Sequence, residues 1–432
     1  MNTILAPVTV THENYRNVAQ KTRRPITVSL RQESSVRRII ADVRKRGDAA
    51  LLEYTRKFDG ANLTRRQLRV RPAETRKAIE GVDRHVAEAM RFALKRLGEC
   101  QKKLLSRVDF SIRMNGFAIH LTAKPLSSVG CYIPGGRAAY PSTVLMTAGL
   151  ARLAGVQRIV VCTPPNASGA INESILMASS LCDVDEVYKC GGPQAIAALA
   201  YGTKTISNVD KIVGPGGLHV ALAKRHVSKD VAIDFFAGPT EILIAVDETT
   251  DARQAAWDLI AQAEHGEDSF TNLVTVSKIS ASNVRAEVNR ILPSVERRRF
   301  VEDSLCRGVT AVCEDWETAC NYINELAPEH VELLTEAPRR LVGRITSAGL
   351  ILLGPYAPAA ASDYCMGTDH VLPTGGSAAN HSGLSVLDFL KLRWTAEGTP
   401  KGLRSLLQPL KALASAEGLP NHYLSAESRF RM

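Results

Sequence analysis

A glutamine and a histidine three residues apart are the first candidates for chemistry in this sequence. Gln262 and His265 fall in a run with helical periodicity, so their side chains leave one face, and Gly266 marks the expected helix end. An amide oxygen and an imidazole on one face can bind a single metal ion. Judged by spacing alone, a surface polar pair at a helix end is the simpler interpretation.

An adjacent Glu–His pair is the second candidate. Glu329 and His330 lie between an expected helix that ends near Leu326 and an apolar run. A carboxylate beside an imidazole is suited to acid–base catalysis. Because neighbouring residues of an extended chain point to opposite sides, the two would do different jobs. On its own, the pair is more typical of a solvated loop.

Carboxylates and histidines are concentrated toward the end of the chain. The segment 361–370 is dense in both and follows an expected strand, at whose carboxyl end α/β sheets usually bind ligands. Five of the ten histidines lie beyond residue 260, at positions 265, 330, 370, 381 and 422. The sequence suggests a zinc site built from Gln262, His265, either Asp363 or Asp369, and one further histidine.

Glycine pairs follow three of the expected strands and precede helices, where backbone N–H groups can bind phosphate. They are Gly135-Gly136, Gly191-Gly192 and the turn Gly214–Gly217. The dinucleotide-binding pattern G-x-G-x-x-G is absent. A nucleotide site and three plain strand-to-helix turns are therefore both open interpretations.

Hydrophobic periodicity predicts the elements that must position these residues. Residues 34–58 and 73–105 have helical spacing, with Gly47 interrupting the first run and Gly60 ending it. From residue 127 to residue 354, short apolar runs alternate with helical runs. This alternation predicts an α/β protein with two Rossmann-like domains, each a parallel sheet with helices on both faces.

The last fifty residues have a different pattern. Residues 382–432 are Leu-rich and helical in spacing, with Pro409 in the middle and no expected strand. They cannot bury a core alone, so we expect them to dock on another domain or subunit. We expect four parts. The first is a mainly helical N-terminal region at 1–126, and the second is a Rossmann-like domain at 127–239. The third is a second α/β domain at 240–381, on which part of the N-terminal region packs, and the fourth is a helical tail at 382–432.

The net charge of +10 raises the alternative of a nucleic-acid-binding protein. Residues 1–110 contain 25 Lys and Arg against 12 Asp and Glu, whereas the rest contains 29 against 32. The excess is thus confined to the helical first quarter, where basic residues alternate with apolar ones as on a solvated helix face. No helix-turn-helix, zinc-finger or RNP pattern accompanies it, which makes nucleic-acid binding the remote interpretation.

Cysteine usage and hydropathy indicate a cytoplasmic protein. The nine cysteines are odd in number and form no C-x-x-C, which fits a reducing compartment better than a disulfide framework. The first residues lack the charged and then apolar pattern of a signal peptide. No run of about 18 uncharged apolar residues predicts a membrane span.

Taken together in order and spacing, these motifs and others resemble the L-histidinol dehydrogenase family over essentially the whole chain. The matching stretches are IIADVRKRGDAALLEYTRKFDG, SVGCYIPGGRAAYPSTVLM, KCGGPQAIAALAYGT, VDKIVGPGG, AGPTEILIAVD, QAEHGEDS, LAPEHVELL, SDYCMGTDHVLPT, SGLSVLDFLK and AEGLPNHYLS. The resemblance implies a homodimeric, cytoplasmic, zinc- and NAD-dependent enzyme of histidine biosynthesis. It would oxidise L-histidinol to L-histidine in two NAD-dependent steps through the aldehyde.

The resemblance also assigns roles to residues of this chain. It implies one zinc ion per subunit, held by Gln262, His265, Asp363 and His422, the last supplied by the tail of the partner subunit. It implies catalysis by Glu329 and His330 and contacts of Tyr132 and Gln194 with NAD. The implied substrate contacts are Thr240, Gln262, His265, His330, Asp363, Glu417 and His422.

Several positions depart from the family pattern. Gly217 stands where an Asn that contacts the cofactor is usual, a loss worth about 1 kcal/mol if it removes one neutral hydrogen bond. Thr240 stands where Ser is usual, and 378–381 replace an Ala-Arg-aromatic run. One alternative is therefore a paralogue that oxidises a different amino alcohol or diol. Another is a metal hydrolase built on Gln262, His265 and Asp363, which would need no NAD.

Overall fold

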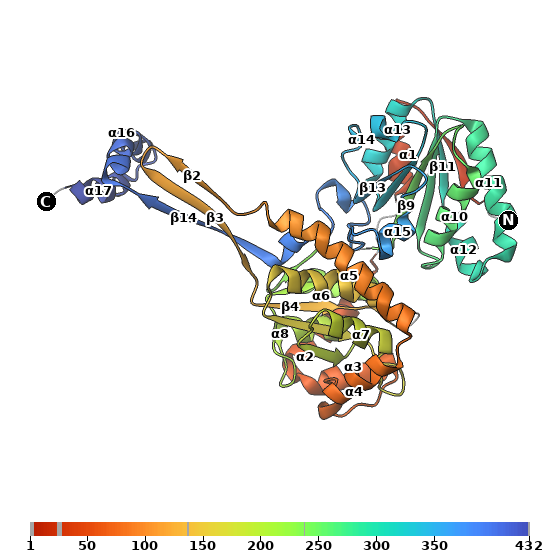
Figure 1. Ribbon diagram of the computed structural model, residues 1–432, viewed down its shortest axis with the longest axis horizontal. Helices are drawn as coiled ribbons and strands as arrows, with labels where there is room; N and C mark the ends of the chain where they lie inside the picture. The colour runs from red at the N-terminus through yellow and green to blue at the C-terminus, as the bar shows by residue number, and fades with distance from the viewer. Residues whose placement is uncertain (1–3, 24–27, 136–137, 237, 431–432) are drawn as a thin grey trace. The chain divides into compact units, whose positions relative to one another are not determined.

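The computed structural model describes residues 4–23, 28–135, 138–236 and 238–430, which form two compact units (Figure 1). The first unit comprises Met1–Gln101 and Leu126–Phe389, and the second comprises Lys102–Pro125 and Leu390–Met432. The first unit contains two parallel sheets, whereas the second contains an antiparallel sheet. The α/β class and the two Rossmann-like sheets expected from the sequence are confirmed.

Sheet B is a five-stranded parallel sheet in the first unit. Its order is β6-β5-β4-β7-β8, with bounds Glu186–Lys189, Arg158–Thr163, Ser128–Tyr132, Lys211–Val213 and Ala232–Ile233. Every neighbouring pair is parallel, and the order along the chain reverses between β4 and β7, as in a Rossmann fold. The reversal opens the carboxyl edge of sheet B at the point where the glycine turns lie.

Helices that follow the strands of sheet B are themselves covered by an outer layer from the N-terminal region. The inner helices are α6, α7, α8 and α9, at Pro141–Ala154, Glu173–Leu181, Gly192–Tyr201 and Leu218–Val227. The outer helices are α2, α3, α4 and α5, at Leu30–Arg46, Asp48–Asp59, Pro72–Gly81 and Arg84–Leu105. Helix α2 packs on α8 and α9, and α4 packs on α7 (Figure 1). The helices expected from periodicity therefore bury their apolar stripes here, while their basic faces stay exposed.

Sheet A is the six-stranded parallel sheet of the first unit. Its order is β1-β11-β10-β9-β12-β13, with bounds Ala6–Val10, Val309–Cys313, Phe270–Thr275, Glu241–Val246, His330–Leu334 and Leu350–Leu353. Strand β1 comes from the N-terminus and pairs with β11, so the first residues complete the edge of this sheet. Without β1, the first strand of this sheet along the chain is β9, and the strand order reverses next to it, between β9 and β12.

The central strand β9 is buried on both faces, which explains its uninterrupted apolar sequence. Ile242, Ile244 and Val246 enter one core cluster, and Leu243 and Ala245 enter another. The surrounding helices are α1, α10, α11, α12, α13, α14 and α15, at Tyr15–Thr22, Ala252–Ala263, Lys278–Ile291, Arg298–Leu305, Trp316–Leu326, Pro338–Val342 and Ala359–Tyr364. This double burial fixes the position of the first residues of β9.

The second unit is not purely helical, so the expectation of no strand after residue 382 was wrong. Its antiparallel sheet has the order β14-β3-β2, with bounds Leu390–Gly398, Phe117–Pro125 and Phe110–Met114 (Figure 1). Helices α16 and α17 follow, at Pro400–Ala416 and Pro420–Glu427. Strand β14 forms because it pairs along its whole length with β3, a segment more than 250 residues earlier. Large apolar side chains remain exposed on this unit, among them Ile112, Leu392, Trp394 and Leu413.

Among the described residues, no helix combines the length and the apolar character that crossing a bilayer requires.

Candidate active site

The candidate catalytic residues gather at the amino edge of sheet A. Thr240 and Glu241 stand where β9 begins, and His330 is the first residue of the adjacent strand β12. Glu329 immediately precedes it. Ligand-binding loops are expected at the carboxyl ends of parallel strands, but in sheet A these residues come together at the opposite edge.

Glu329 is 5% exposed and is held by a reciprocal pair of hydrogen bonds with Glu241. Its Oε2 accepts from the Glu241 backbone N–H and from the Thr240 hydroxyl, both at 2.7 Å. Its own N–H donates to the Glu241 carboxylate at 3.3 Å. Burial raises the pKa of Glu329 to about 6 and that of Glu241 to about 8. Glu329 is therefore a fixed carboxylate with an unusually high proton affinity.

His330 is 2% exposed and has one ring nitrogen committed to the backbone. Nδ1 lies 3.1 Å from the Glu241 carbonyl oxygen, which assigns the N–H to this atom. Nε2 has no hydrogen-bond partner among the described residues, and it lies 3.6 Å from Asp363 Oδ1. Burial alone would lower the pKa of His330, but the Glu329 charge and the Asp363 carboxylate raise it to about 9. Nε2 is thus the atom left for exchange of a proton.

Helices α10 and α15 bring three further side chains to one cavity of about 600 Å³. Gln262 lies in the last turn of α10, His265 just beyond its end, and Asp363 in α15. The Gln262 amide nitrogen donates to the Thr240 hydroxyl at 2.6 Å. With its nitrogen engaged in this way, the amide oxygen is the atom available to a metal ion. The Thr240 hydroxyl consequently links a metal-ligand candidate to Glu329.

The donor set formed by Gln262, His265 and Asp363 fits zinc but does not complete its coordination. Burial lowers the pKa of His265, which favours the neutral ring that binds metals. Burial alone would raise the pKa of Asp363, but the neighbouring His330 lowers it, so this ligand is ionised. In the described part of the chain, no group of three or more His, Cys, Asp or Glu side chains could hold a metal ion. Zinc usually takes four ligands, so water, substrate or another residue would complete this set.

Glu417 and His422 are predicted substrate contacts, and His422 is also a predicted zinc ligand. Both residues belong to the second unit. Glu417 is the residue that ends α16, and His422 lies in the first turn of α17. Both are exposed on that unit. They are therefore not members of the buried cluster that the first unit forms.

Tyr132 and Gln194, the predicted NAD contacts, lie at the carboxyl edge of sheet B. Tyr132 ends β4, and its hydroxyl accepts a hydrogen bond from the Gly192 N–H at 3.1 Å. Gln194 lies in the first turn of α8, is fully buried, and has no hydrogen-bond partner among the described residues for either amide atom. An orphaned buried amide beside a glycine turn fits a site for a polar cofactor that supplies the missing bonds.

The glycine turn after β7 is built around Gly214. Gly214 has φ of 112°, and a Cβ on it would lie 2.2 Å from the Tyr132 carbonyl oxygen. The buried ion pair of Lys224 and Asp234 holds it, since Lys224 donates to its carbonyl at 2.9 Å and Asp234 accepts from its N–H at 2.8 Å. Gly217 has open space around it. Of the other predicted turns, Gly136 lies outside the described residues.

Replacing Gly214 by alanine is expected to lower the free energy of unfolding by about 3 kcal/mol, because the left-handed backbone and the contact with Tyr132 both oppose a methyl group. Chemical denaturation would measure the loss. Gly217→Ala is the matched control: its φ is −62° and no atom lies within 4 Å of the added Cβ, so its stability should stay within about 1 kcal/mol of wild type. Equal stability of the two variants would contradict the steric argument.

Two residues at the site were not singled out by sequence reasoning. Glu241 looks like an ordinary first residue of a strand, and only the pairing of β9 with β12 reveals its bonds to Glu329 and His330. His370 was counted among the late histidines without a specific role, and its Nδ1 lies 2.7 Å from the Asp363 carbonyl oxygen. Asp369, the alternative to Asp363 as a ligand, instead accepts a hydrogen bond from the Val371 N–H of its own loop.

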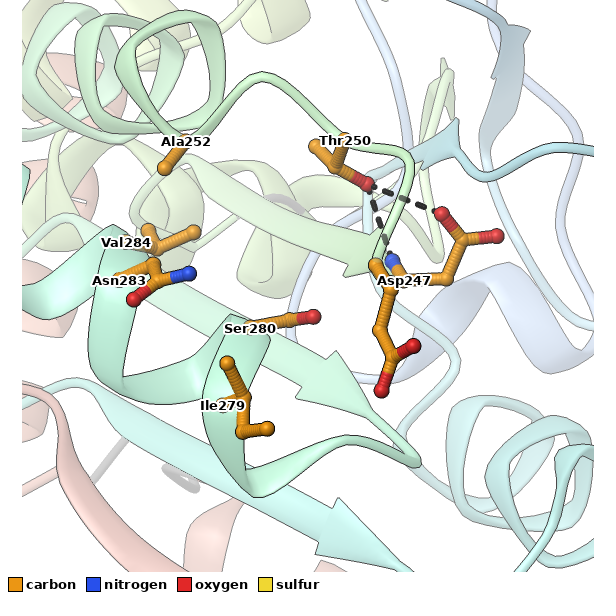
Figure 2. Close-up of a pocket in the computed structure, with 8 residues that line it drawn as sticks. Asp247, Thr250, Ala252, Ile279, Ser280, Asn283 and Val284 are labelled. Carbon is orange, nitrogen blue, oxygen red and sulfur yellow. Dashed lines mark hydrogen bonds between the residues drawn. The ribbon is translucent and has the colours of Figure 1, made fainter.

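A second, smaller cavity of about 220 Å³ lies at the carboxyl edge of sheet A (Figure 2). Figure 2 shows the Thr250 hydroxyl bonded to both the backbone and the carboxylate of Asp247. The other Asp247 carboxylate oxygen accepts from the Glu336 N–H after β12, so the reversal between β9 and β12 is bridged by hydrogen bonds. This cavity is smaller than typical ligand pockets, and its Asp247 and Glu248 would repel a pyrophosphate.

Comparison with known proteins places the chain within one family. The family model for histidinol dehydrogenase matches residues 22–430. The histidinol dehydrogenase of Methanosarcina mazei is 42% identical over 397 residues, covering 92% of this chain and 91% of the relative. That of Lactococcus lactis is 40% identical and covers 94% and 95%.

The fold agrees with the sequence relationship. The crystal structure of histidinol dehydrogenase from Elizabethkingia anophelis matches with a TM-score of 0.94 at 34% identity, over 99% of this chain and 98% of that one. Since the match covers 99% of this chain, both units share the fold of that structure. The chain belongs to the histidinol dehydrogenase family.

Proposed function

We propose that this chain oxidises L-histidinol to L-histidine, a reaction of histidine biosynthesis, in two NAD-dependent steps through the aldehyde. One observation carries the proposal: a buried Glu329–His330 pair lies beside Gln262, His265 and Asp363, with Nε2 of His330 unpartnered and aimed at Asp363. A base, a metal-ligand set and a cavity are the parts that oxidation of a polar alcohol requires.

Gln262, His265 and Asp363 are the residues of the first unit that would hold zinc, together with His422. Zinc, when bound, supplies a charged anchor that orients the nitrogen atoms of the substrate. The balance of charge favours a cationic amino alcohol, since Asp258, Glu264 and Asp363 line the cavity against the single arginine Arg297, and Glu329 is buried next to His330. The substrate would thus be held by ligands on α10 and α15.

His330 would accept the alcohol proton at Nε2 while NAD takes up the hydride. The hydrogen bond from Nδ1 to the Glu241 carbonyl fixes the tautomer and leaves the lone pair on Nε2. The His330 pKa of about 9 depends on the Glu329 charge and, after it, on Asp363, and a cation bound to Asp363 would weaken the second contribution. Such a cation would lower the pKa of His330 and favour the neutral ring that can accept a proton.

Glu329 would accept a proton from water in the second step, when the aldehyde is oxidised. Its raised pKa of about 6 makes it a better base than an ordinary carboxylate, yet leaves it ionised at pH 7. The Thr240 hydroxyl and the Glu241 N–H hold it in place. Tyr132 and Gln194 at the carboxyl edge of sheet B would contact the cofactor.

The Thr240 hydroxyl should matter more than its methyl group. Thr240→Val removes the bond to Glu329 and the partner of the Gln262 amide, so kcat should fall about tenfold to a hundredfold. Thr240→Ser keeps the hydroxyl and should stay within about threefold of wild type. Steady-state kinetics with histidinol would compare the two variants. If valine is tolerated as well as serine, the hydroxyl link has no role.

Product analysis tests the function. Purified protein with zinc, NAD and histidinol should form histidine and two NADH per histidine. The competing candidate, a paralogue acting on another amino alcohol or diol, is favoured by Gly217 and Thr240 and predicts NADH formation only with other members of an alcohol panel. Absence of histidine at millimolar histidinol would reject the proposal, and zinc-dependent hydrolysis without NAD would indicate a hydrolase instead.

We further infer a homodimer in which the second unit of one subunit completes the site of the other. Support comes from the exposed His422, which could fill the fourth zinc position left by Gln262, His265 and Asp363, and from the exposed apolar side chains of the second unit. We place the enzyme in the cytoplasm, because nine cysteines without a disulfide-framework pattern suit a reducing compartment.

A further inference from the structure

Glu332 is a buried carboxyl group that the reaction does not use. It is the third residue of β12, has no exposed surface, and points to the same face of the strand as His330, two residues earlier. Its Oε1 accepts a hydrogen bond from the Ala359 N–H at 2.5 Å. Its Oε2 has no donor among the described residues. A fully buried acid in this position needs a partner that keeps it neutral or satisfies its charge.

Asp258 supplies that partner. Its carboxyl group lies on α10 within hydrogen-bonding reach of the Glu332 carboxyl group. A hydrogen bond between two carboxyl groups requires a proton on one of them, because an ionised carboxylate can only accept. Burial and the neighbouring Asp258 charge raise the pKa of Glu332 to about 8, and burial raises that of Asp258 as well. The hydrogen bond therefore links α10 to β12 with one of the two carboxyl groups protonated.

The pair joins three elements that carry the proposed site. Asp258 lies one helical turn before Gln262, whose helix α10 ends beside His265. Glu332 belongs to β12, which begins at His330. Ala359 is the first residue of α15, which carries Asp363 four residues later. A cavity wall includes Asp258, Ala359 and the metal-ligand candidates together.

We propose that the Asp258–Glu332 pair positions the zinc ligands, by fixing α10 and α15 on β12 at a set distance from His330. The inference rests on the proposed zinc site. Apolar contacts on the same face support the arrangement: Leu334 of β12 packs in one cluster with Leu259 of α10 and Ala359 of α15. Such contacts set the spacing of the layers, but they are not directional. The carboxyl pair adds directional bonds close to the proposed zinc ligands. Asp258 and Glu332 are therefore positioning residues for Gln262, His265 and Asp363.

The test compares a conservative with a disruptive change at Glu332. In Glu332→Gln the amide oxygen can accept from Ala359 and the amide N–H can donate to Asp258, which replaces the shared proton. In Glu332→Leu the shape is retained but both bonds are lost. Zinc affinity is measured by competition with a chromogenic chelator, and ligand geometry by the visible absorption spectrum of the cobalt-substituted protein.

We expect Glu332→Leu to bind zinc about tenfold to a hundredfold more weakly and to alter the cobalt spectrum. Glu332→Gln should stay within about threefold of wild type, with an unchanged spectrum. Asp258→Leu should weaken zinc binding as Glu332→Leu does, and Asp258→Asn should stay near wild type as Glu332→Gln does. Because Asp258 is only half-buried, these variants keep the test decisive if Glu332→Leu does not fold. Asp251→Ala removes only the N-cap of the same helix, so it should lower stability without changing zinc affinity.

Two outcomes overturn the inference alone: leucine variants that bind zinc as tightly as wild type, or glutamine and asparagine variants as defective as the leucine ones. The second outcome would mean that any change at the pair disturbs the fold. A wild-type protein that takes up no zinc contradicts the proposed zinc site and the inference with it. The wild-type titration therefore distinguishes the two failures.

Discussion

Replacement of His330 by asparagine is expected to lower kcat by about 10²- to 10⁴-fold while zinc stays bound. Asparagine can still donate to the Glu241 carbonyl in place of Nδ1, so the strand end should keep its structure. It cannot accept a proton where Nε2 now faces Asp363. The first oxidation step loses the base that takes the alcohol proton, whereas the metal ligands are untouched.

Stopped-flow measurement of NADH formation and metal analysis of the same sample would test this prediction. His381→Asn is the matched control, because His381 is exposed and its ring bonds only to the neighbouring Asn380 among the described residues. Its kcat should equal that of wild type. A His330→Asn enzyme within tenfold of wild type would remove His330 from the base role, and loss of zinc would assign it a role in metal binding.

Replacement of His422 by alanine is expected to reduce zinc from one ion per chain to a small fraction of that, with a parallel loss of turnover of at least about a hundredfold. The first unit offers an amide, an imidazole and a carboxylate, one ligand short of the usual four. His422 is exposed on the second unit and is therefore free to bind a metal ion presented by another surface. Metal analysis after gel filtration would measure the loss, and His219→Ala provides a control outside the donor set.

Mixed dimers reveal whether His422 acts across the subunit boundary. In a hybrid of His330→Asn and His422→Ala chains, a ligand donated by the partner restores one complete site, because the chain with intact His330 receives an intact His422. Such a hybrid should reach about half of the activity per dimer. If each tail serves its own chain, both sites of the hybrid are defective and mixing restores nothing.

The sequence predicts most of the fold because local patterns determine it. Apolar runs followed by glycine turns identify the strands of both parallel sheets, and 3.6-residue periodicity identifies α2, which buries Val36, Ile39 and Val43 as expected. Strand β14 could not be predicted in this way. Most of its residues are exposed, and its pairing with β3 and the Phe110–Trp394 ring contact at 5.7 Å depend on a segment far away in sequence.

The site was predictable in its members but not in its arrangement. Gln262, His265 and Asp363 could be named from residue type, spacing and family resemblance. Their meeting with His330 at the amino edge of sheet A depends on α15, which is bonded to the middle of β12 through Glu332. Tertiary packing of this kind leaves no periodic signal in the sequence, and for the same reason Glu241 passes unnoticed.

The bridged carboxyl edge of sheet A has a consequence for stoichiometry. Asp247 and Thr250 lie where a dinucleotide would enter a Rossmann-like domain of sheet A, and hydrogen bonds tie them to each other and to the end of β12. With the cofactor at sheet B as proposed, both oxidations would use one cofactor site in succession. NADH would then leave and NAD would bind while the aldehyde stays in the active site. Retention of the aldehyde intermediate during this exchange of cofactor would then be a task of the protein.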